Sequence, residues 1–182
     1  MNLKARRFAS VCSLVLVCSL QAQTRNTVPP AKSLIDRALK TARTEHKTVF
    51  IHFGASWCKW CKELDSALDS PELRTLIAGH FVLVHLTVQE SDDKKSLENP
   101  GAEKLMNETG GGKTGVPYYL FLDKDGMKIA NSMAMPDGGN IGYPATPEEI
   151  KTFGDLLPRA APRMTAANRA LIVDYLTRHA PK

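Results

Sequence analysis

Apolar residues recur along the chain with two different periods, and each period predicts a different kind of element. In several segments they return at helical spacing with polar residues between them. Helices are therefore predicted at residues 32–45, 57–69, 71–78, 102–109 and 165–179, and at a segment opening at Thr146 or Pro147. Short runs rich in β-branched and aromatic residues predict strands at residues 48–53, 81–88, 116–122 and 127–135.

The order of these elements limits the fold class. Helices alternate with the first three strands, whereas the turn at residues 123–126, DKDG, joins the last two strands as a hairpin. The run at residues 81–88, FVLVHLTV, is nearly continuously apolar, which is typical of a buried central strand. We expect an α/β fold in which helices flank a central mixed sheet, with a C-terminal helical extension within residues 136–182.

The first 22 residues have the three parts of a secretory signal. Residues 4–7 carry three basic side chains, residues 8–20 are apolar and uncharged, and Ala22 is a small residue before a cleavage point. The apolar run is short for a membrane span, which needs about 20 apolar residues. We expect residues 1–22 to be a signal peptide and the protein to be exported to a periplasmic or other extracytoplasmic compartment. An uncleaved membrane anchor is the alternative, and residues 23–31 form a linker.

Composition and charge add to this picture once the leader is set aside. The chain has 182 residues, of which 43% are hydrophobic and 24% charged, as in one ordinary globular domain. This composition excludes collagen-like, coiled-coil and fully disordered chains. The net charge of +5 falls to +2 without the basic leader residues, with 21 basic against 19 acidic side chains. Such a weak charge gives no reason to expect nucleic acid as a partner.

Removal of the leader would leave two of the four cysteines, Cys58 and Cys61. A bond between cysteines three positions apart closes a very short loop, so it stabilises the fold little through chain entropy. Disulfide frameworks use more cysteines at wider spacing. The pair is therefore better explained by chemistry than by a structural role.

The two cysteines fall where a predicted strand turns into a predicted helix. The N-terminus of a helix offers unpaired N–H groups and partial positive charge, and both stabilise a thiolate. We therefore expect Cys58 to be the nucleophile, with Lys59 adding positive charge nearby. Cys61 lies one helical turn later, where it can attack a mixed disulfide formed at Cys58.

These residues resemble a known family. Residues 53–61, FGASWCKWC, resemble the active-site segment of the thioredoxins, and residues 115–118, GVPY, resemble the second hallmark of that family. Residues 61–63, CKE, are similar to the C-terminal periplasmic domain of the membrane reductase DsbD and its exported relatives. The resemblance covers roughly residues 32–135, and it implies a thioredoxin fold and thiol–disulfide exchange without an organic cofactor.

The resemblance also implies a substrate-binding element. In the thioredoxins a cis proline opens a strand beside the cysteine pair and presents backbone to the substrate, a role that falls here on Val116 and Pro117. Pro117 follows Cys58 by 59 residues, later than in a minimal thioredoxin. An insertion at about residues 89–114 explains the delay, so we expect residues 32–182 to form one thioredoxin-like domain with this insertion.

Four other side chains near the cysteines receive roles by the same resemblance. His52 stands six residues before the first cysteine, where thioredoxins usually have a buried acid that transfers protons at the second cysteine. His52 and Glu63 are both candidates for that role, and packing under the sheet is the alternative for His52. Trp57 is expected to line the rim and shield the thiols, and Trp60 is either a docking surface or a packing residue.

A structural or metal-binding role is the main alternative for the cysteine pair. Zinc needs four ligands, no second cysteine pair remains, and His52, His80 and His85 are scattered without ligand spacing. No metal ligand is predicted on this basis. Met133 and Met135 would give copper two thioether ligands beside the cysteines, but methionines two apart on a strand also pack a core.

The sequence thus predicts an exported thiol–disulfide oxidoreductase that acts on protein thiols and disulfides through its CxxC pair. A reductase in an oxidising compartment needs an external electron source, such as a membrane disulfide reductase. The alternative is a thioredoxin-like binding module that holds copper or a partner protein without redox turnover. The dipeptide Lys59-Trp60 replaces the Gly-Pro of thioredoxins, so the direction of electron flow stays open.

Overall fold

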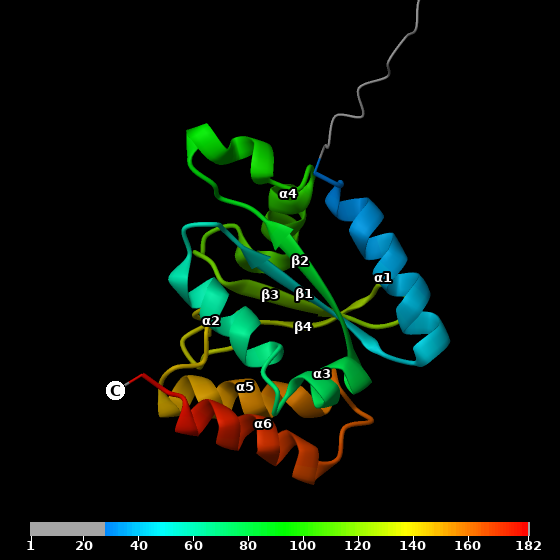
Figure 1. Cartoon of the computed structure of the whole chain (residues 1–182), viewed down its shortest axis with the longest axis vertical. Coiled ribbons are helices and arrows are strands. Elements are labelled where there is room, and N and C mark those ends of the chain that lie inside the picture. The colour runs from blue at the N-terminus through cyan, green and yellow to red at the C-terminus, as the bar shows by residue number, and fades with distance from the viewer. Residues whose placement is uncertain (1–27, 182) are drawn as a thin grey trace, which may run out of the picture.

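The computed structural model describes residues 28–181, which form a four-stranded sheet with helices on both faces (Figure 1). The helices are α1 (Ala31–Glu45), α2 (Lys59–Leu68), α3 (Arg74–His80), α4 (Ala102–Met106), α5 (Pro147–Ala160) and α6 (Ala166–Arg178). The strands are β1 (Thr48–Gly54), β2 (Phe81–Thr87), β3 (Tyr118–Leu122) and β4 (Lys128–Asn131). Two short helical turns, η1 (Asp92–Leu97) and η2 (Asn107–Gly111), lie between β2 and β3.

The strands lie in the order β2-β1-β3-β4. β2 runs parallel to β1, whereas β3 runs antiparallel to β1 and to β4, so the sheet is mixed. β1 is internal to the sheet and every one of its residues is buried. This arrangement confirms the predicted α/β class with a helix-flanked mixed sheet, and α5 and α6 are the predicted C-terminal helices.

Alternate residues of β1 pack into two separate apolar cores. Val49, Ile51 and Phe53 belong to the core that α1 covers. Phe50 belongs to the larger core on the opposite face, where its ring centroid lies 4.6 Å from that of Phe121. Figure 1 shows α1 on one side of the sheet and α5 and α6 side by side on the other. Because side chains alternate along a strand, His52 shares the face of Phe50 and lies on the α2 side.

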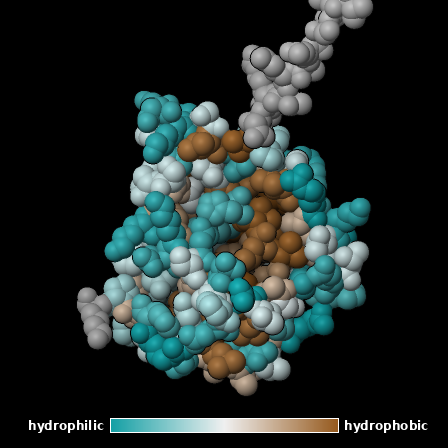
Figure 2. Space-filling model, viewed as in Figure 1, coloured by the Kyte–Doolittle hydropathy of each residue, from teal (hydrophilic) through white to brown (hydrophobic). Residues whose placement is uncertain are grey.

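The prediction of a central strand at residues 81–88 is wrong, because β2 is an edge strand. Val84 and Leu86 are buried in the α1-side core, but Leu83 is 47% exposed. Figure 2 shows an apolar strip along the face viewed, where Figure 1 places β2. An apolar run shows that a strand carries hydrophobic side chains, but it does not show how many strands pair with it. β4 pairs with β3 at one edge of the sheet, and β2 forms the other edge with β1 as its one neighbouring strand.

Some predicted element ends shift for local reasons. The Val116-Pro117 peptide bond is cis, and β3 begins only at Tyr118, after this bond. The helix predicted at residues 102–109 ends at Met106 and continues as the turn η2, because Gly110 adopts a positive φ of 111° that a right-handed helix does not contain. Type and order of these elements are as predicted, and only their boundaries differ.

The start of α5 is determined by a capping box. The Thr146 hydroxyl accepts the Glu149 N–H at 3.2 Å, and the Glu149 carboxylate accepts the Thr146 N–H at 2.8 Å. One turn further, Phe153 packs edge-on against Tyr119 of β3 with ring centroids 5.8 Å apart. The capping box therefore sets the start of α5, and with it the position at which the apolar side of the helix packs on the sheet. This start agrees with the prediction of a helix that opens at Thr146 or Pro147.

The structure does not test the predicted signal peptide, linker or insertion. The predicted signal peptide, residues 1–22, and most of the linker at 23–31 lie outside the described residues. Between residues 28 and 181, no helix has the length and apolar character that a membrane crossing requires. The segment predicted as an insertion, residues 89–114, contains η1, α4 and η2, and its status as an insertion stays a prediction.

Removing the α5 cap should lower the stability of the whole domain. We expect Thr146→Ala to reduce the free energy of unfolding by about 1 kcal/mol, because the Glu149 N–H loses its acceptor. Urea unfolding followed by circular dichroism measures this difference. Thr146→Ser keeps the hydroxyl and should unfold close to the wild type, and an equal loss in both variants would rule out the cap as the cause.

Candidate active site

Cys58 and Cys61 form a disulfide at the N-terminus of α2. Their Cα atoms lie 5.3 Å apart, and each residue is only 2% exposed. Cys58 is the N-cap residue, with an extended backbone, and its sulfur accepts the N–H of Cys61 at 3.0 Å. The helix predicted at residues 57–69 therefore begins at Lys59, because Cys58 occupies the cap position before the first helical residue.

The electrostatics of this helix end favour a charged sulfur at Cys58. The Cys61 N–H points at the sulfur, and the helix dipole places partial positive charge there. When the disulfide is reduced, both features stabilise the thiolate over the thiol. Lys59 is exposed and its ammonium lies 5.3 Å from the centre of the Trp60 ring, so this cation is also engaged with the indole.

The second sequence hallmark lies directly against the disulfide. The carbonyl oxygen of Val116 is 3.6 Å from the Cys58 sulfur, and the Val116 side chain packs against Cys58 and Cys61. Pro117 is buried, and its carbonyl oxygen accepts the Asn140 side-chain N–H at 2.9 Å. Two motifs far apart in the sequence thus form one surface.

The two tryptophans flank the disulfide in different ways. Trp57 is 57% exposed, and its indole N–H donates to the Gln89 carbonyl oxygen at 2.8 Å. Trp60 is 40% exposed and stacks on Tyr143, with ring centroids 5.6 Å apart and an interplanar angle of 14°. Trp60 is therefore both packed and accessible, so the two predicted alternatives for it are not exclusive.

A buried carboxylate orders the turn before Cys58. Glu90 is 4% exposed and accepts the Ser56 N–H at 2.5 Å and the Ser56 hydroxyl at 2.8 Å. The adjacent Gln89 carbonyl accepts the Trp57 indole, as described above. Since β1 and β2 are parallel, the residues that follow each strand meet at one edge of the sheet. The chain after β2 thus holds the turn that carries Cys58.

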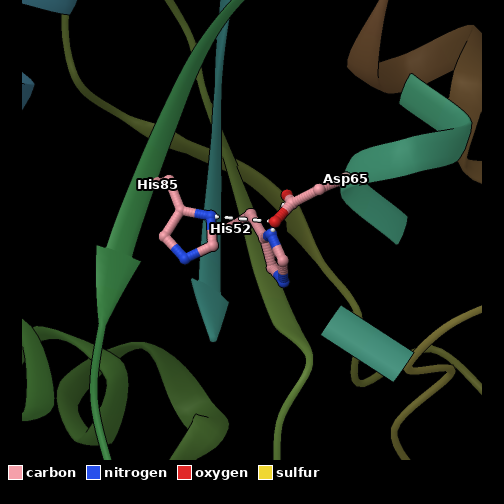
Figure 3. Close-up of side chains that lie close together, drawn as sticks. All are labelled: His52, Asp65 and His85. Atoms are coloured by element: carbon pink, nitrogen blue, oxygen red, sulfur yellow. Dashed lines mark hydrogen bonds and ion pairs between the residues drawn. The ribbon is translucent and has the colours of Figure 1, made fainter. Parts of the chain in front are cut away.

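Three further side chains meet on the α2 side of the sheet (Figure 3). Two of them, Asp65 and His85, line a cleft together with Cys61. Nδ1 of His52 lies 2.7 Å from one carboxylate oxygen of Asp65, and Nδ1 of His85 lies 3.3 Å from the other. The parallel register pairs His52 of β1 with His85 of β2, and Asp65 comes from α2. His52 is buried, whereas the side chains of Asp65 and His85 are 45% and 47% exposed.

Burial and hydrogen bonding shift the pKa values in this cluster in a definite direction. Burial lowers the pKa of the His52 imidazole, and the hydrogen bond and charge of Asp65 offset this only in part. Partial burial alone would raise the pKa of Asp65, but the hydrogen bonds from His52 and His85 hold it well below its usual value. Nε2 of His52 has no hydrogen-bond partner among residues 28–181, so Asp65 alone orients this ring through a polar contact.

Two sequence-based interpretations change here. Glu63 is exposed on α2, and Asp65 is the carboxylate that contacts His52. The expectation of scattered histidines is wrong for His52 and His85, which are register neighbours with ring centroids 4.7 Å apart. A role for His52 or Glu63 in proton transfer stays a prediction.

Sequence reasoning missed Glu90, Asp65 and His85. Asp65 had a signal, since it follows Cys61 by four positions and therefore shares its helix face. Glu90 had a weaker signal, as a carboxylate two positions after the strand predicted at residues 81–88. His85 had none, because its position beside His52 depends on strand register.

Comparisons with known proteins agree with this geometry. A family model described as thioredoxin-like matches residues 31–124. The disulfide bond reductase DsbH of Chlamydia pneumoniae is 32% identical over 111 residues, which cover 58% of this chain and 63% of that protein. The thiol:disulfide interchange protein DsbD of Photorhabdus laumondii is 30% identical over 91 residues, 50% of this chain and 14% of that protein.

The chain spans less than two thirds of the length of either relative. Among solved structures, a disulphide isomerase from Xylella fastidiosa Temecula1 aligns with 22% identity and a TM-score of 0.48. That alignment covers 91% of this chain and 98% of the other.

Loss of the Glu90 carboxylate should destabilise the turn before Cys58. We expect Glu90→Ala to lower the free energy of unfolding by about 1–3 kcal/mol, because the Ser56 N–H and hydroxyl lose their acceptor. Equilibrium unfolding of the oxidised protein in urea measures the change. Glu103→Ala, at an exposed position of α4, is the matched control and should stay within about 0.5 kcal/mol of the wild type. Equal stability of both variants would contradict a holding role for Glu90.

Proposed function

The chain belongs to the thioredoxin-like family, and from this we propose that it is an exported thiol–disulfide oxidoreductase acting on proteins. The observation that carries the proposal is the position of the Cys58–Cys61 disulfide. Its first sulfur caps α2 and accepts the Cys61 N–H, and the Val116 carbonyl lies 3.6 Å away. These contacts favour both the breaking and the re-forming of a disulfide at the Cys58 sulfur, whereas a purely structural cross-link needs none of them.

In the reducing direction the Cys58 thiolate attacks one sulfur of a substrate disulfide. The substrate S–S bond breaks, a mixed disulfide to Cys58 forms, and the other substrate sulfur leaves as a thiolate that takes a proton from solvent. The Cys61 thiolate then attacks the Cys58 sulfur, which restores the internal disulfide and releases the second substrate thiol. Two electrons pass to the substrate, and the same steps in reverse oxidise a substrate dithiol.

The substrate chain is proposed to bind across Val116 and Pro117. Val116 places backbone beside the Cys58 sulfur, so an extended substrate segment that pairs there brings its own sulfur into reach. Trp60, held flat against Tyr143, offers a preformed aromatic surface on one side of the disulfide. Trp57, with its indole N–H tied to Gln89, lines the other part of the rim.

We propose that electrons flow from a membrane disulfide reductase through this protein to substrate disulfides. The relative from Chlamydia pneumoniae is named a disulfide bond reductase, and the second relative is named a thiol:disulfide interchange protein. In an oxidising compartment a dithiol must be regenerated from outside, because its surroundings favour the disulfide. A donor anchored in the membrane meets this requirement.

The copper-binding alternative gains no support from the packing of the methionines. Met133 packs against the α1-side core, and Met135 packs against the core on the opposite face. The two side chains therefore serve separate cores. A thioether pair beside the cysteines is not favoured by this arrangement.

Turnover should depend on the first cysteine. We expect the wild type to catalyse the reduction of insulin by dithiothreitol and Cys58→Ser to fall to the uncatalysed rate, because the serine hydroxyl is not ionised at neutral pH. Insulin turbidity measures the rate. Ser66→Ala, at an exposed position of the same helix, is the control and should keep wild-type turnover.

The second cysteine should be needed to resolve the intermediate. Cys61→Ser is expected to accumulate a mixed disulfide with insulin chains. Non-reducing electrophoresis should show this covalent complex, and a reducing agent should cleave it. Wild-type turnover in Cys58→Ser, or no mixed disulfide in Cys61→Ser, would contradict the proposed mechanism.

Export should be accompanied by cleavage of the leader. Expression of the full chain in a Gram-negative host is expected to give a periplasmic protein that begins at Gln23, identified by N-terminal sequencing. Val15→Arg places a charge in the apolar run and should leave the uncleaved chain inside the cell. Recovery of the wild type in membranes with Met1 still attached would support the anchor and contradict a cleaved signal.

A further inference from the structure

Asp65 and His85, which form a cluster with the buried His52, line a cleft on the α2 side of the sheet. This cleft has a volume of about 350 Å³, and Cys61, Asp65, His85 and Glu90 are among its lining residues. Figure 3 shows both imidazole rings and the carboxylate converging from β1, β2 and α2. Three elements that are separate in the sequence therefore present nitrogen and oxygen donors to one place.

We propose that His52, Asp65 and His85 bind a divalent transition-metal ion, Zn²⁺ in the first instance. Each residue offers one ligand atom, and these atoms all lie within 4.8 Å of one another. Atoms that share one zinc ion lie within about 4 Å of each other, because each is about 2 Å from the metal. The contacts of Asp65 with the two rings, at 2.7 and 3.3 Å, are already in that range.

The donor set selects the class of metal. Two imidazoles and one carboxylate are borderline ligands that suit Zn²⁺ and its neighbours in the first transition row, whereas Ca²⁺ and Mg²⁺ prefer oxygen alone. Three protein ligands leave a coordination position open, which is the pattern of zinc sites that keep a water molecule. That position would face the cleft shared with Cys61.

One of the three ligands is fixed and the other two can move, so a metal ion can bind without a change of fold. His52 is buried in the internal strand and orients the site from below. Asp65 and His85 are about half exposed, so their side chains can move by a few tenths of an ångström without disturbing a core. The rigid ligand thus sets the position of the ion and the two exposed ligands close around it.

Gly54 keeps the space between the cluster and the disulfide open. A Cβ at this position would lie 3.2 Å from Cβ of Cys61 and 3.3 Å from two atoms of the His85 ring. Any larger residue would therefore push His85 away from Cys61. Glycine at the end of β1 preserves the position of His85 that the metal site requires.

The test uses the oxidised protein, so that it does not depend on redox turnover. Free thiols are first blocked with iodoacetamide, which leaves the Cys58–Cys61 disulfide intact and removes any other cysteine as a ligand. Titration calorimetry with Zn²⁺ is expected to give one ion per chain. Titration with Co²⁺ should give visible d–d absorption without a thiolate-to-cobalt charge-transfer band.

Ligand variants decide the assignment. His85→Ala and Asp65→Asn change partly exposed side chains, and circular dichroism checks that both fold. Each should weaken Zn²⁺ binding by at least about tenfold, since even groups that only support a ligand cost that much when lost. His80→Ala removes a histidine outside the cluster and should bind as the wild type does.

Three results would overturn the site: no Zn²⁺ binding by the wild type, wild-type affinity in either ligand variant, or equal weakening in His80→Ala. None of them bears on disulfide exchange, because the cysteines are oxidised throughout. Insulin reduction by the untreated protein is a separate measurement, so failure of the metal site and failure of the proposed redox function are distinguishable.

Discussion

The proposed chemistry of this protein depends on one hydrogen bond, from the Cys61 N–H to the Cys58 sulfur. It forms because β1 is buried along its whole length, ends at Gly54, and is followed by α2 from Lys59. A strand buried on both faces cannot slide without moving its side chains out of both cores. The sheet therefore holds the N-terminus of α2 in place, and the partial positive charge of the helix end favours a thiolate at that position when the disulfide is reduced.

The parallel pairing of β1 with β2 adds two features to this arrangement. It brings the chain that follows β2 against the turn that follows β1, where Glu90 accepts two hydrogen bonds from Ser56. It also places His85 beside His52, within reach of Asp65 on α2. A single strand pairing thus supplies both the support for the turn before Cys58 and a cluster of potential metal ligands next to Cys61. Both are consequences of register, which aligns side chains that share no local sequence context.

Much of the fold could be predicted from local patterns. The start of α5 after Thr146 follows from a hydroxyl and a carboxylate three positions apart, and the position of Cys58 follows from a strand, a glycine turn and a helix in succession. Predictions failed where an answer depended on partners elsewhere in the chain. The apolar neighbours of Leu83 in the sequence predict a buried side chain, but Leu83 is exposed, since β2 is an edge strand with one neighbouring strand. Asp65 contacts His52 although Glu63 is nearer in sequence, because Asp65 follows Cys61 by one helical turn and shares its face.

Residues a few positions apart are enough to place a cysteine pair at a helix N-terminus, since helix capping and the helix dipole act within one turn. The same local rules identify the order of helices and strands and the mixed character of the sheet. They do not reveal that His52 and His85 are neighbours, or that Glu90 reaches Ser56. Those contacts join segments more than 30 residues apart, and their geometry is decided when two strands are packed in one register between two cores.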